Sequence, residues 1–408
     1  MWSTNLDLYP SPLSVREEDI NDAMIAVRRD IHAHPELRFE EHRTSNIVVD
    51  RLMGWGVETH RGLAGTGVVG TIRGNRPGRS IGLRADMDAL PLQEANNFLH
   101  RSQHEGKMHA CGHDGHVAML LGAAEVLARD RNFAGQIHLI FQPGEEGGEG
   151  AQVMIDQGLF EQFPCDAIFA LHNWPGIPSG TFAVTPGPIM ASCNEFHITI
   201  KGRGAHAALP HNGNDPLYCA TQVVNGLQSV ITRDKRPMEA AVLSVTQFHA
   251  GETNNIIPET AWISGTVRTF SKEVLNQIEV RMQVIAENVC RAYGCEAVFE
   301  FKRQSPPTIN NPVQTNFAVR IMEALVGKDK VNAEVEPTMG AEDFSYMLER
   351  VPGCYAFIGN GDGEHRESGH GLGPCTLHNA CYDFNDEILP LGATYFVNLA
   401  RLYLSWTP

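Results

Sequence analysis

The 408-residue sequence lacks the features that would direct it to a membrane or into a secretory pathway. Its longest apolar runs fall short of the ~18 consecutive apolar residues that a membrane-spanning helix needs. The first residues, MWSTNLDLYPSPL, contain no basic segment followed by an apolar block, which is the pattern of a secretory signal. We therefore expect a cytoplasmic protein with no membrane partner.

Basic residues and regularly spaced cysteines are also scarce. Lys and Arg number 32 against 48 Asp and Glu, which gives a net charge of −16. Nucleic acid is therefore not expected as a partner, because binding phosphates requires a basic surface. The nine cysteines are an odd number without the spacing of a disulfide framework. In a cytoplasmic chain we expect most of them to be buried free thiols.

No internal repeat or low-complexity tract appears, and the remaining composition is that of a globular protein. Hydrophobic residues make up 42% of the chain and charged residues 20%. Such a chain can bury enough apolar surface to offset the entropy lost on ordering, which argues against disorder. At roughly 150 residues per domain, the length suggests about two to three domains.

Strands alternate with helices in the first part of the chain. Apolar spacing predicts helices near 15–31, 43–53, 114–129 and 149–158, and strands near 67–72, 80–85, 136–142 and 166–172. Alternation of this kind is typical of a layered α/β fold with a largely parallel sheet.

The middle of the chain follows a different order. It predicts strands near 194–202, 240–250, 260–269 and 295–303, helices near 215–232 and 271–293, and a loop between the second and third strands. This β-α-β-β-α-β order is the ferredoxin-like pattern. We therefore predict an inserted domain at 190–305 between two parts of one α/β domain, 1–189 and 306–408. The second part closes with a helix near 384–404.

Polar side chains gather just after several predicted strands. They are Asp86 and Asp88, Cys111 and His113, Glu145 and Glu146, and His172. Open α/β sheets bind ligands outside the carboxyl ends of their strands. These side chains are therefore expected to form one site.

Cys111 and His113 are one residue apart in a loop before a helix. A thiolate and an imidazole at this spacing can bind a divalent metal, with zinc the usual ion and manganese, cobalt or nickel as alternatives. By itself the pair is better explained as a buried cysteine beside a helix-capping segment. Metal binding becomes the favoured interpretation once the two glutamates and His172 are added.

Glu145 and Glu146 are adjacent acids in the segment PGEEGGEG. Neighbouring residues of an extended chain point to opposite sides. One carboxylate can therefore bind a metal while the other takes a proton from the attacking water, as metal-assisted hydrolysis requires. A solvated acidic loop is the alternative if the segment is considered alone.

Several segments together resemble the metal-dependent amidohydrolase/aminoacylase family. This family includes hippurate hydrolases, N-acyl-amino-acid amidohydrolases and plant indoleacetyl-amino-acid hydrolases. The similarity starts at HAHPEL (32–37) and continues in order to the last helix. Its motifs are MHACGHDGH (108–116), FQPGEEGGEGA (141–151), ALHNWPG (170–176), GRGAHAALPH (202–211), NIIPETAWISGTVRTF (255–270), MGAEDFSYM (339–347) and LHNACYDFND (377–386).

The resemblance implies a metallopeptidase-like α/β catalytic domain with an inserted lid and dimerisation domain. It also implies two divalent metal ions per subunit, with manganese or zinc expected. The implied ligands are Cys111, His113, Glu146, His172 and His378, with Cys111 bridging the two ions. Glu145 matches the general base, and Asp86 and Asp88 match a motif that we interpret as support behind the ligands.

Three residues of the inserted domain also match functional positions of the family. By resemblance, His206 polarises the scissile carbonyl, and Asn255 and Arg268 hold the substrate carboxylate. Without the resemblance they would be an ordinary loop histidine, turn asparagine and surface arginine. The inserted domain further implies a homodimer, or a dimer of dimers, in which His206 can act on the neighbouring subunit.

The implied activity is hydrolysis of the amide bond of N-acyl-L-amino acids to a carboxylic acid and a free amino acid. A dipeptidase or carboxypeptidase on the same scaffold is the nearest alternative. A non-catalytic metal or thiol sensor using Cys111 is more remote, because a sensor has no use for Glu145 beside a ligand. The acyl group and the preferred amino acid stay open.

Overall fold

The computed structural model describes residues 18–366 and 368–405, which form two compact units. The larger unit contains the chain up to Ile189, Ile309–Glu336 and the chain from Tyr346 onward, and the smaller unit contains Met190–Thr308 and Pro337–Ser345. Residues 15–17 of the first expected helix lie outside the described residues. Among the described helices, none is both long enough and apolar enough to cross a bilayer.

The larger unit is built on an eight-stranded mixed sheet with the order β1-β2-β4-β3-β5-β16-β6-β15. The four central strands, β4, β3, β5 and β16, are parallel, as expected from the sequence for β4, β3 and β5. On one side β1 and β2 are antiparallel, because a short turn that allows no crossover joins them. On the other side β6 is antiparallel to β16, and the edge strand β15 is parallel to β6. The strands are β1 (Glu58–Leu63), β2 (Gly67–Arg73), β3 (Arg76–Asp86), β4 (Ala134–Gln142), β5 (Ala167–Pro175), β6 (Phe182–Ala183), β15 (Val331–Asn332) and β16 (Gly353–Gly361).

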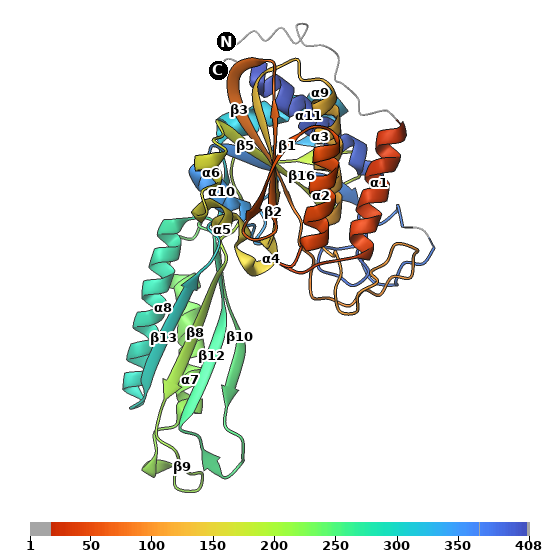
Figure 1. Ribbon diagram of the computed structural model, residues 1–408. Helices are drawn as coiled ribbons and strands as arrows, with labels where there is room; N and C mark the ends of the chain where they lie inside the picture. The colour runs from red at the N-terminus through yellow and green to blue at the C-terminus, as the bar shows by residue number, and fades with distance from the viewer. Residues whose placement is uncertain (1–17, 367, 406–408) are drawn as a thin grey trace. The chain divides into compact units, whose positions relative to one another are not determined.

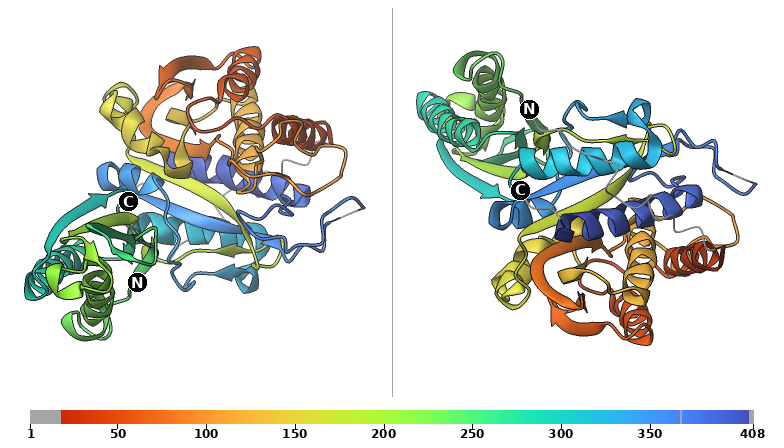
Figure 2. Two further views of the ribbon diagram at one scale, coloured as in Figure 1. Left: turned by 90° about the horizontal axis from the view of Figure 1, so that it is seen from below. Right: turned by 90° about the horizontal axis from the view of Figure 1, so that it is seen from above.

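Helices cover this sheet and bury its apolar side chains. The central helix α3 (His113–Arg129) is buried along most of its length, which fits its apolar sequence, and it packs against α1, α2 and α11 (Figure 1). The last helix, α11, runs along the large sheet (dark blue in Figure 2). The other helices are α1 (Glu18–Ala33), α2 (His42–Gly54), α4 (Glu145–Gly148), α5 (Gly150–Asp156), α6 (Leu159–Gln162), α9 (Pro312–Val326), α10 (Phe344–Arg350) and α11 (Leu389–Ser405).

The smaller unit has the β-α-β-β-α-β order that the sequence predicts. Its antiparallel sheet has the order β10-β12-β8-β13, and helices α7 and α8 pack on one face of it (Figure 1). The elements are β8 (Asn194–Lys201), α7 (Pro216–Ser229), β10 (Ala241–Ala250), β12 (Thr260–Thr269), α8 (Lys272–Ala292) and β13 (Glu296–Arg303). The fold is therefore ferredoxin-like.

Short pairings add to these two sheets. The expected loop between the second and third strands of the smaller unit contains β11 (Ile256–Ile257), which pairs with β9 (Ala205–His206). Two residues are too few to show a strand periodicity, so the sequence gives no signal for them. β7 (Gly187–Met190) and β14 (Thr308–Asn310) form another two-stranded pair.

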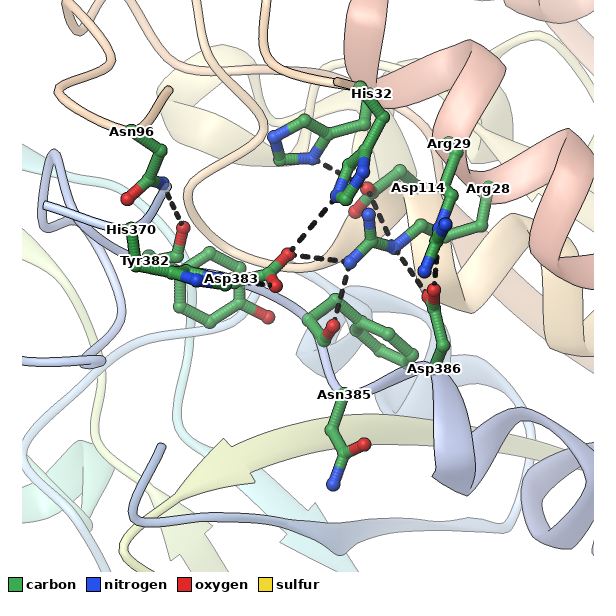
Figure 3. Close-up of polar contacts among 12 residues, drawn as sticks. Arg28, Arg29, His32, Asn96, Asp114, His370, Tyr382, Asp383, Asn385 and Asp386 are labelled. Atoms are coloured by element: carbon green, nitrogen blue, oxygen red, sulfur yellow. Dashed lines mark hydrogen bonds and ion pairs between the residues drawn. The ribbon is translucent and has the colours of Figure 1, made fainter. Parts of the chain in front are cut away.

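A buried charged network ties α1 to α3 and to the C-terminal segment of the larger unit (Figure 3). Arg28 is fully buried, and its Nη2 atom donates to Asp383 Oδ1 at 2.6 Å. Its Nε atom lies 3.0 Å from Asp386 Oδ1. His32, also fully buried, contacts Asp114 Oδ2 through Nδ1 at 2.8 Å and Glu94 Oε1 through Nε2 at 3.3 Å. The buried charges therefore compensate one another.

We predict that His32 makes folding stability depend on pH. Burial alone would lower the pKa of His32, but its hydrogen bond and charge interaction with Asp114, together with Glu94, raise it to about 9. The unfolded pKa is about 6.5, so the stabilisation is complete below about pH 6.5 and is lost as the pH rises through about 9. Urea unfolding at pH 6–10 should show the stability gap between wild type and His32→Gln shrinking over this range. A gap independent of pH would contradict the prediction.

Candidate metal centre

The expected site residues of the larger unit lie at one edge of its sheet. Strands β4, β3 and β5 are parallel neighbours, so their carboxyl ends meet at the same edge. Asp86 is the last residue of β3, Glu145 and Glu146 follow β4, and His172 lies in the last half of β5. The sheet thus brings together side chains from distant parts of the sequence.

Cys111 and His113 reach this edge because of an unusual backbone turn at Gly112. Gly112 has φ 97°, a left-handed conformation that favours glycine. A Cβ atom at this position would lie 2.1 Å from Asn173 Oδ1, so a side chain is sterically excluded as well. The turn starts α3 at His113 and leaves Cys111 Sγ 3.5 Å from His172 Nε2.

Backbone carbonyls set the protonation of two imidazoles. His172 Nδ1 lies 2.6 Å from Asn173 O, and His113 Nδ1 lies 2.8 Å from Asp88 O. A carbonyl oxygen only accepts, so each Nδ1 carries a proton, and Nε2 is the nitrogen of each ring that can bind a metal when deprotonated. His113 Nε2 is buried and has no hydrogen-bond partner among the described residues. Both imidazoles are therefore prepared to bind a metal through Nε2.

His378 joins the site from a distant part of the chain. Its backbone has φ 60°, and its N–H donates to Ala110 O at 2.7 Å. Its Nε2 atom lies 3.1 Å from Glu146 Oε1. The left-handed backbone and the bond to Ala110 therefore place the imidazole next to Cys111 and Glu146.

Within the larger unit, the potential ligand atoms form three overlapping groups, and in each group all atoms lie within 4.8 Å of one another. These groups are Cys111, Glu146 and His378; His113, Glu145 and Glu146; and Asp86, His113, His116 and His172. Together they contain all five expected ligands and the expected base. Sulfur, imidazole nitrogen and carboxylate oxygen are the donors that zinc and related ions prefer. The buried, unpartnered Nε2 of His113 adds to this fit, so the residues present suit a divalent metal.

His116 and Asn173 support the site from behind. His116 Nδ1 lies 2.6 Å from Asp86 Oδ1, and its Nε2 lies 2.8 Å from Asn173 Oδ1. Both imidazole nitrogens thus have protein partners, which fits support better than ligation. Asn173 was not among the expected site residues, although it directly follows the expected ligand His172.

Asp86 and Asp88 hold other groups in place. Burial alone would raise the pKa of Asp86, but Arg84, His113 and His116 lower it well below its usual value. Asp88 accepts a hydrogen bond from Glu145 N at 3.0 Å through Oδ1 and from Glu146 N at 2.9 Å through Oδ2. One carboxylate therefore fixes the backbone of both adjacent acids, as expected for support behind the ligands.

The electrostatics of the cluster also favour a cation. Burial, with the nearby charge of Glu146, raises the pKa of the Cys111 thiol. Hydrogen bonds to Cys111 and Glu146 raise the pKa of His378 to about 10. The cluster therefore holds protons that a divalent ion would displace, since metal ligands must be deprotonated.

The expected residues of the smaller unit fall at two ends of its sheet. His206 lies in β9, and Asn255 O accepts from Ala207 N at 3.0 Å, so these residues are neighbours beyond one end (Figure 1). Arg268 lies near the opposite end of β12, with its Nε donating to Thr266 Oγ1 at 3.1 Å. From Thr260 to Arg268 an extended strand spans roughly 26 Å at ~3.3 Å per residue. The structure thus brings His206 and Asn255 together and separates both from Arg268.

Known proteins resemble the chain over almost its whole length. The model of the Peptidase family M20/M25/M40 matches residues 82–401. A hippurate hydrolase of Campylobacter jejuni is 38% identical over 95% of this chain and 98% of its own. A thermostable carboxypeptidase of Saccharolobus solfataricus is also 38% identical, over 94% of this chain and 96% of its own.

The fold agrees with this similarity. A solved dinuclear metal binding peptidase of the M20 family from Bacillus subtilis superimposes with a TM-score of 0.81 and is 34% identical, over 95% of this chain and 99% of that one. This similarity and the donor cluster described above indicate a metal-dependent hydrolase. The chain therefore belongs to the peptidase family M20/M25/M40.

Proposed function

We propose that the protein hydrolyses the amide bond of N-acyl-L-amino acids and uses two divalent metal ions, manganese or zinc. The observation that carries this proposal is the adjacent pair Glu145 and Glu146, whose backbone N–H groups are both held by Asp88. Glu146 contacts His378 on one side of the cluster, at 3.1 Å. This arrangement supports one carboxylate as a ligand and the other as a base.

In this mechanism, Cys111, His113, Glu146, His172 and His378 would hold the two ions. The chemistry that bound ions would supply is polarisation of the scissile carbonyl and a lowered pKa of water. Glu145 takes the proton of the attacking water and then delivers it to the leaving amine nitrogen. The fixed loop conformation keeps the Glu145 carboxyl near the reacting atoms, so little reorganisation is needed during the reaction.

The nearest alternative is a carboxypeptidase or dipeptidase. The hippurate hydrolase and the thermostable carboxypeptidase are equally similar to this chain, so identity alone favours neither activity. A panel that compares N-acyl amino acids with free dipeptides separates the two. Cleavage of N-blocked amino acids at least as fast as of dipeptides is expected, and cleavage of dipeptides alone would contradict the proposal.

Replacing the carboxylate of Glu145 should impair catalysis, whereas replacing that of Glu146 should impair metal binding. Glu145→Gln should keep both metal ions and lose about 10²–10⁴-fold in kcat, because the proton acceptor is gone. Glu146→Gln should lose bound metal. Metal content by mass spectrometry, measured beside kcat, tests both variants. Loss of metal from Glu145→Gln but not from Glu146→Gln would reverse the two roles.

Arg268 should give the enzyme its requirement for a free substrate carboxylate. Its guanidinium is a planar, always charged fork that suits a carboxylate, and Thr266 already orients its Nε. Converting the substrate carboxylate to an amide should lower kcat/KM strongly in wild type. In Arg268→Ala, kcat/KM for the substrate with a free carboxylate should already be low. Converting that carboxylate to an amide should therefore lower kcat/KM much less than in wild type. Arg268→Lys keeps the positive charge but lacks the planar guanidinium. Its loss of kcat/KM on that conversion should lie between the losses of wild type and Arg268→Ala. Equal cleavage of acid and amide by wild type would remove this role.

A homodimer is the assembly in which the residues of the smaller unit can all serve catalysis. His206 and Asn255 lie at one end of the small sheet and Arg268 near the other end, too far apart for one small substrate to contact all three in one chain. A substrate held by Arg268 of one subunit and by His206 of its neighbour removes this difficulty. We therefore propose that His206 acts on the site of the neighbouring subunit.

Mixing two inactive variants tests this proposal. His206→Ala should keep its metal and lose activity, because polarising a developing oxyanion is commonly worth ~2.7–4 kcal/mol. When His206→Ala and Glu145→Gln exchange subunits, a mixed dimer has one site with both wild-type residues, so a fraction of wild-type activity should return. Native mass spectrometry with one variant isotopically labelled verifies the exchange. Proven exchange without recovered activity would place His206 in its own chain.

A further inference from the structure

We propose that Glu41 is a positioning residue for the loop 143–148, which carries Glu145 and Glu146. The inference rests on the proposed roles of these two acids. It concerns the segment HPELRFEE (34–41), which contributes none of the proposed ligands. Through Arg38, Phe39 and Glu41, this segment contacts the loop 143–148.

Glu41 is fully buried and connects three segments of the larger unit. Its Oε1 atom accepts from Gly144 N at 2.9 Å and from Phe39 N at 2.9 Å. Its Oε2 atom accepts from Thr66 Oγ1 at 2.6 Å. Gly144 immediately precedes Glu145, so the Glu41 carboxylate fixes the start of the acidic loop.

Phe39 and Arg38 also contact the loop 143–148. Phe39 has φ 64°, a strained conformation for a residue with a side chain. This conformation places its ring under the loop, where a Cβ atom on Gly144 would lie 2.8 Å from it. Arg38 Nη1 donates to Glu146 O at 3.0 Å. Glu41 holds the Phe39 N–H, so one carboxylate supports both the strained residue and the loop above it.

Contacts to the adjacent helix do not explain why the Glu41 side chain points toward Gly144. Glu41 directly precedes α2, yet its side chain makes no capping hydrogen bond to that helix. Glu36 binds the start of the helix instead, accepting from Arg43 N at 2.8 Å and from Thr44 N at 2.9 Å. The two nearby carboxylates therefore bind different segments: Glu36 binds the start of α2, and Glu41 binds the start of the acidic loop.

Removing the Glu41 carboxylate should slow catalysis without weakening substrate binding. A misplacement of about 1 Å remote from the chemistry can cost 10²-fold in rate. At saturating metal, Glu41→Ala should therefore lose about 10–100-fold in kcat, with KM changed less than about threefold. Amide hydrogen exchange should show faster exchange of Gly144 N–H, the group that Glu41 binds.

Glu41→Gln distinguishes geometry from charge. Burial, together with the charge of Asp88, raises the pKa of Glu41 to about 7, so its neutral form is readily accessible near neutral pH. An amide oxygen can still accept from Gly144 N and Phe39 N, and Thr66 can accept from the amide N–H₂. Glu41→Gln should thus keep kcat within a few-fold of wild type. Glu41→Asp, one methylene shorter, should fold but lose Gly144 protection and about 10-fold in kcat.

Glu36→Ala is the matched control, because it removes from the same segment a partly buried contact that does not reach the loop. It should lower the melting temperature while the folded, metal-loaded protein keeps its kcat and its Gly144 protection. A wild-type kcat in both Glu41→Ala and Glu41→Asp would overturn the proposal. Equal losses in Glu41→Gln and Glu41→Ala, or in Glu36→Ala and Glu41→Ala, would overturn it as well. If Glu41→Ala does not fold, Glu41→Asp and Glu41→Gln decide by the same criteria.

The proposed function can fail without affecting this test. All variants are assayed on whichever amide the wild type cleaves, whether an N-acyl amino acid or a dipeptide. Should the wild type cleave neither, the catalytic proposal fails, and the exchange rate of Gly144 N–H still decides whether Glu41 holds the loop.

Discussion

Parallel pairing of β4, β3 and β5 is the constraint on which the candidate centre depends. It places three carboxyl ends at one edge of the sheet, and each end delivers polar side chains there. Asp86, Glu146 and His172 are far apart in the sequence, and only this pairing makes them neighbours. The outer strands extend the sheet without changing this arrangement.

Around this edge, hydrogen bonds fix the orientation of the side chains and of the loop that the sheet brings together. Carbonyl oxygens hold the Nδ1 atoms of His113 and His172, so both rings present Nε2. Asp88 fixes the two acids from one side, and Glu41 holds Gly144 from another. A site supported in this way keeps its geometry, because further groups hold two of the imidazole rings and the backbone of the acidic loop.

The smaller unit carries the residues that we propose contact the substrate. Its ferredoxin-like sheet carries His206 and Asn255 beyond one end and Arg268 near the other. This separation links the proposed recognition of the substrate carboxylate to assembly of two chains.

The sequence by itself determined what local patterns encode. Its periodicity predicted the central parallel strands and the β-α-β-β-α-β insertion, and its strand ends marked Cys111, His113, Glu145, Glu146 and His172 as one cluster. His378, His206 and Arg268 needed family resemblance, because nothing local distinguishes them from ordinary residues. Only the tertiary structure revealed the hydrogen bonds that Asn173 and Glu41 make around the centre. Their partners lie in other segments, and hydrogen bonds between segments distant in sequence leave no periodic signal in it.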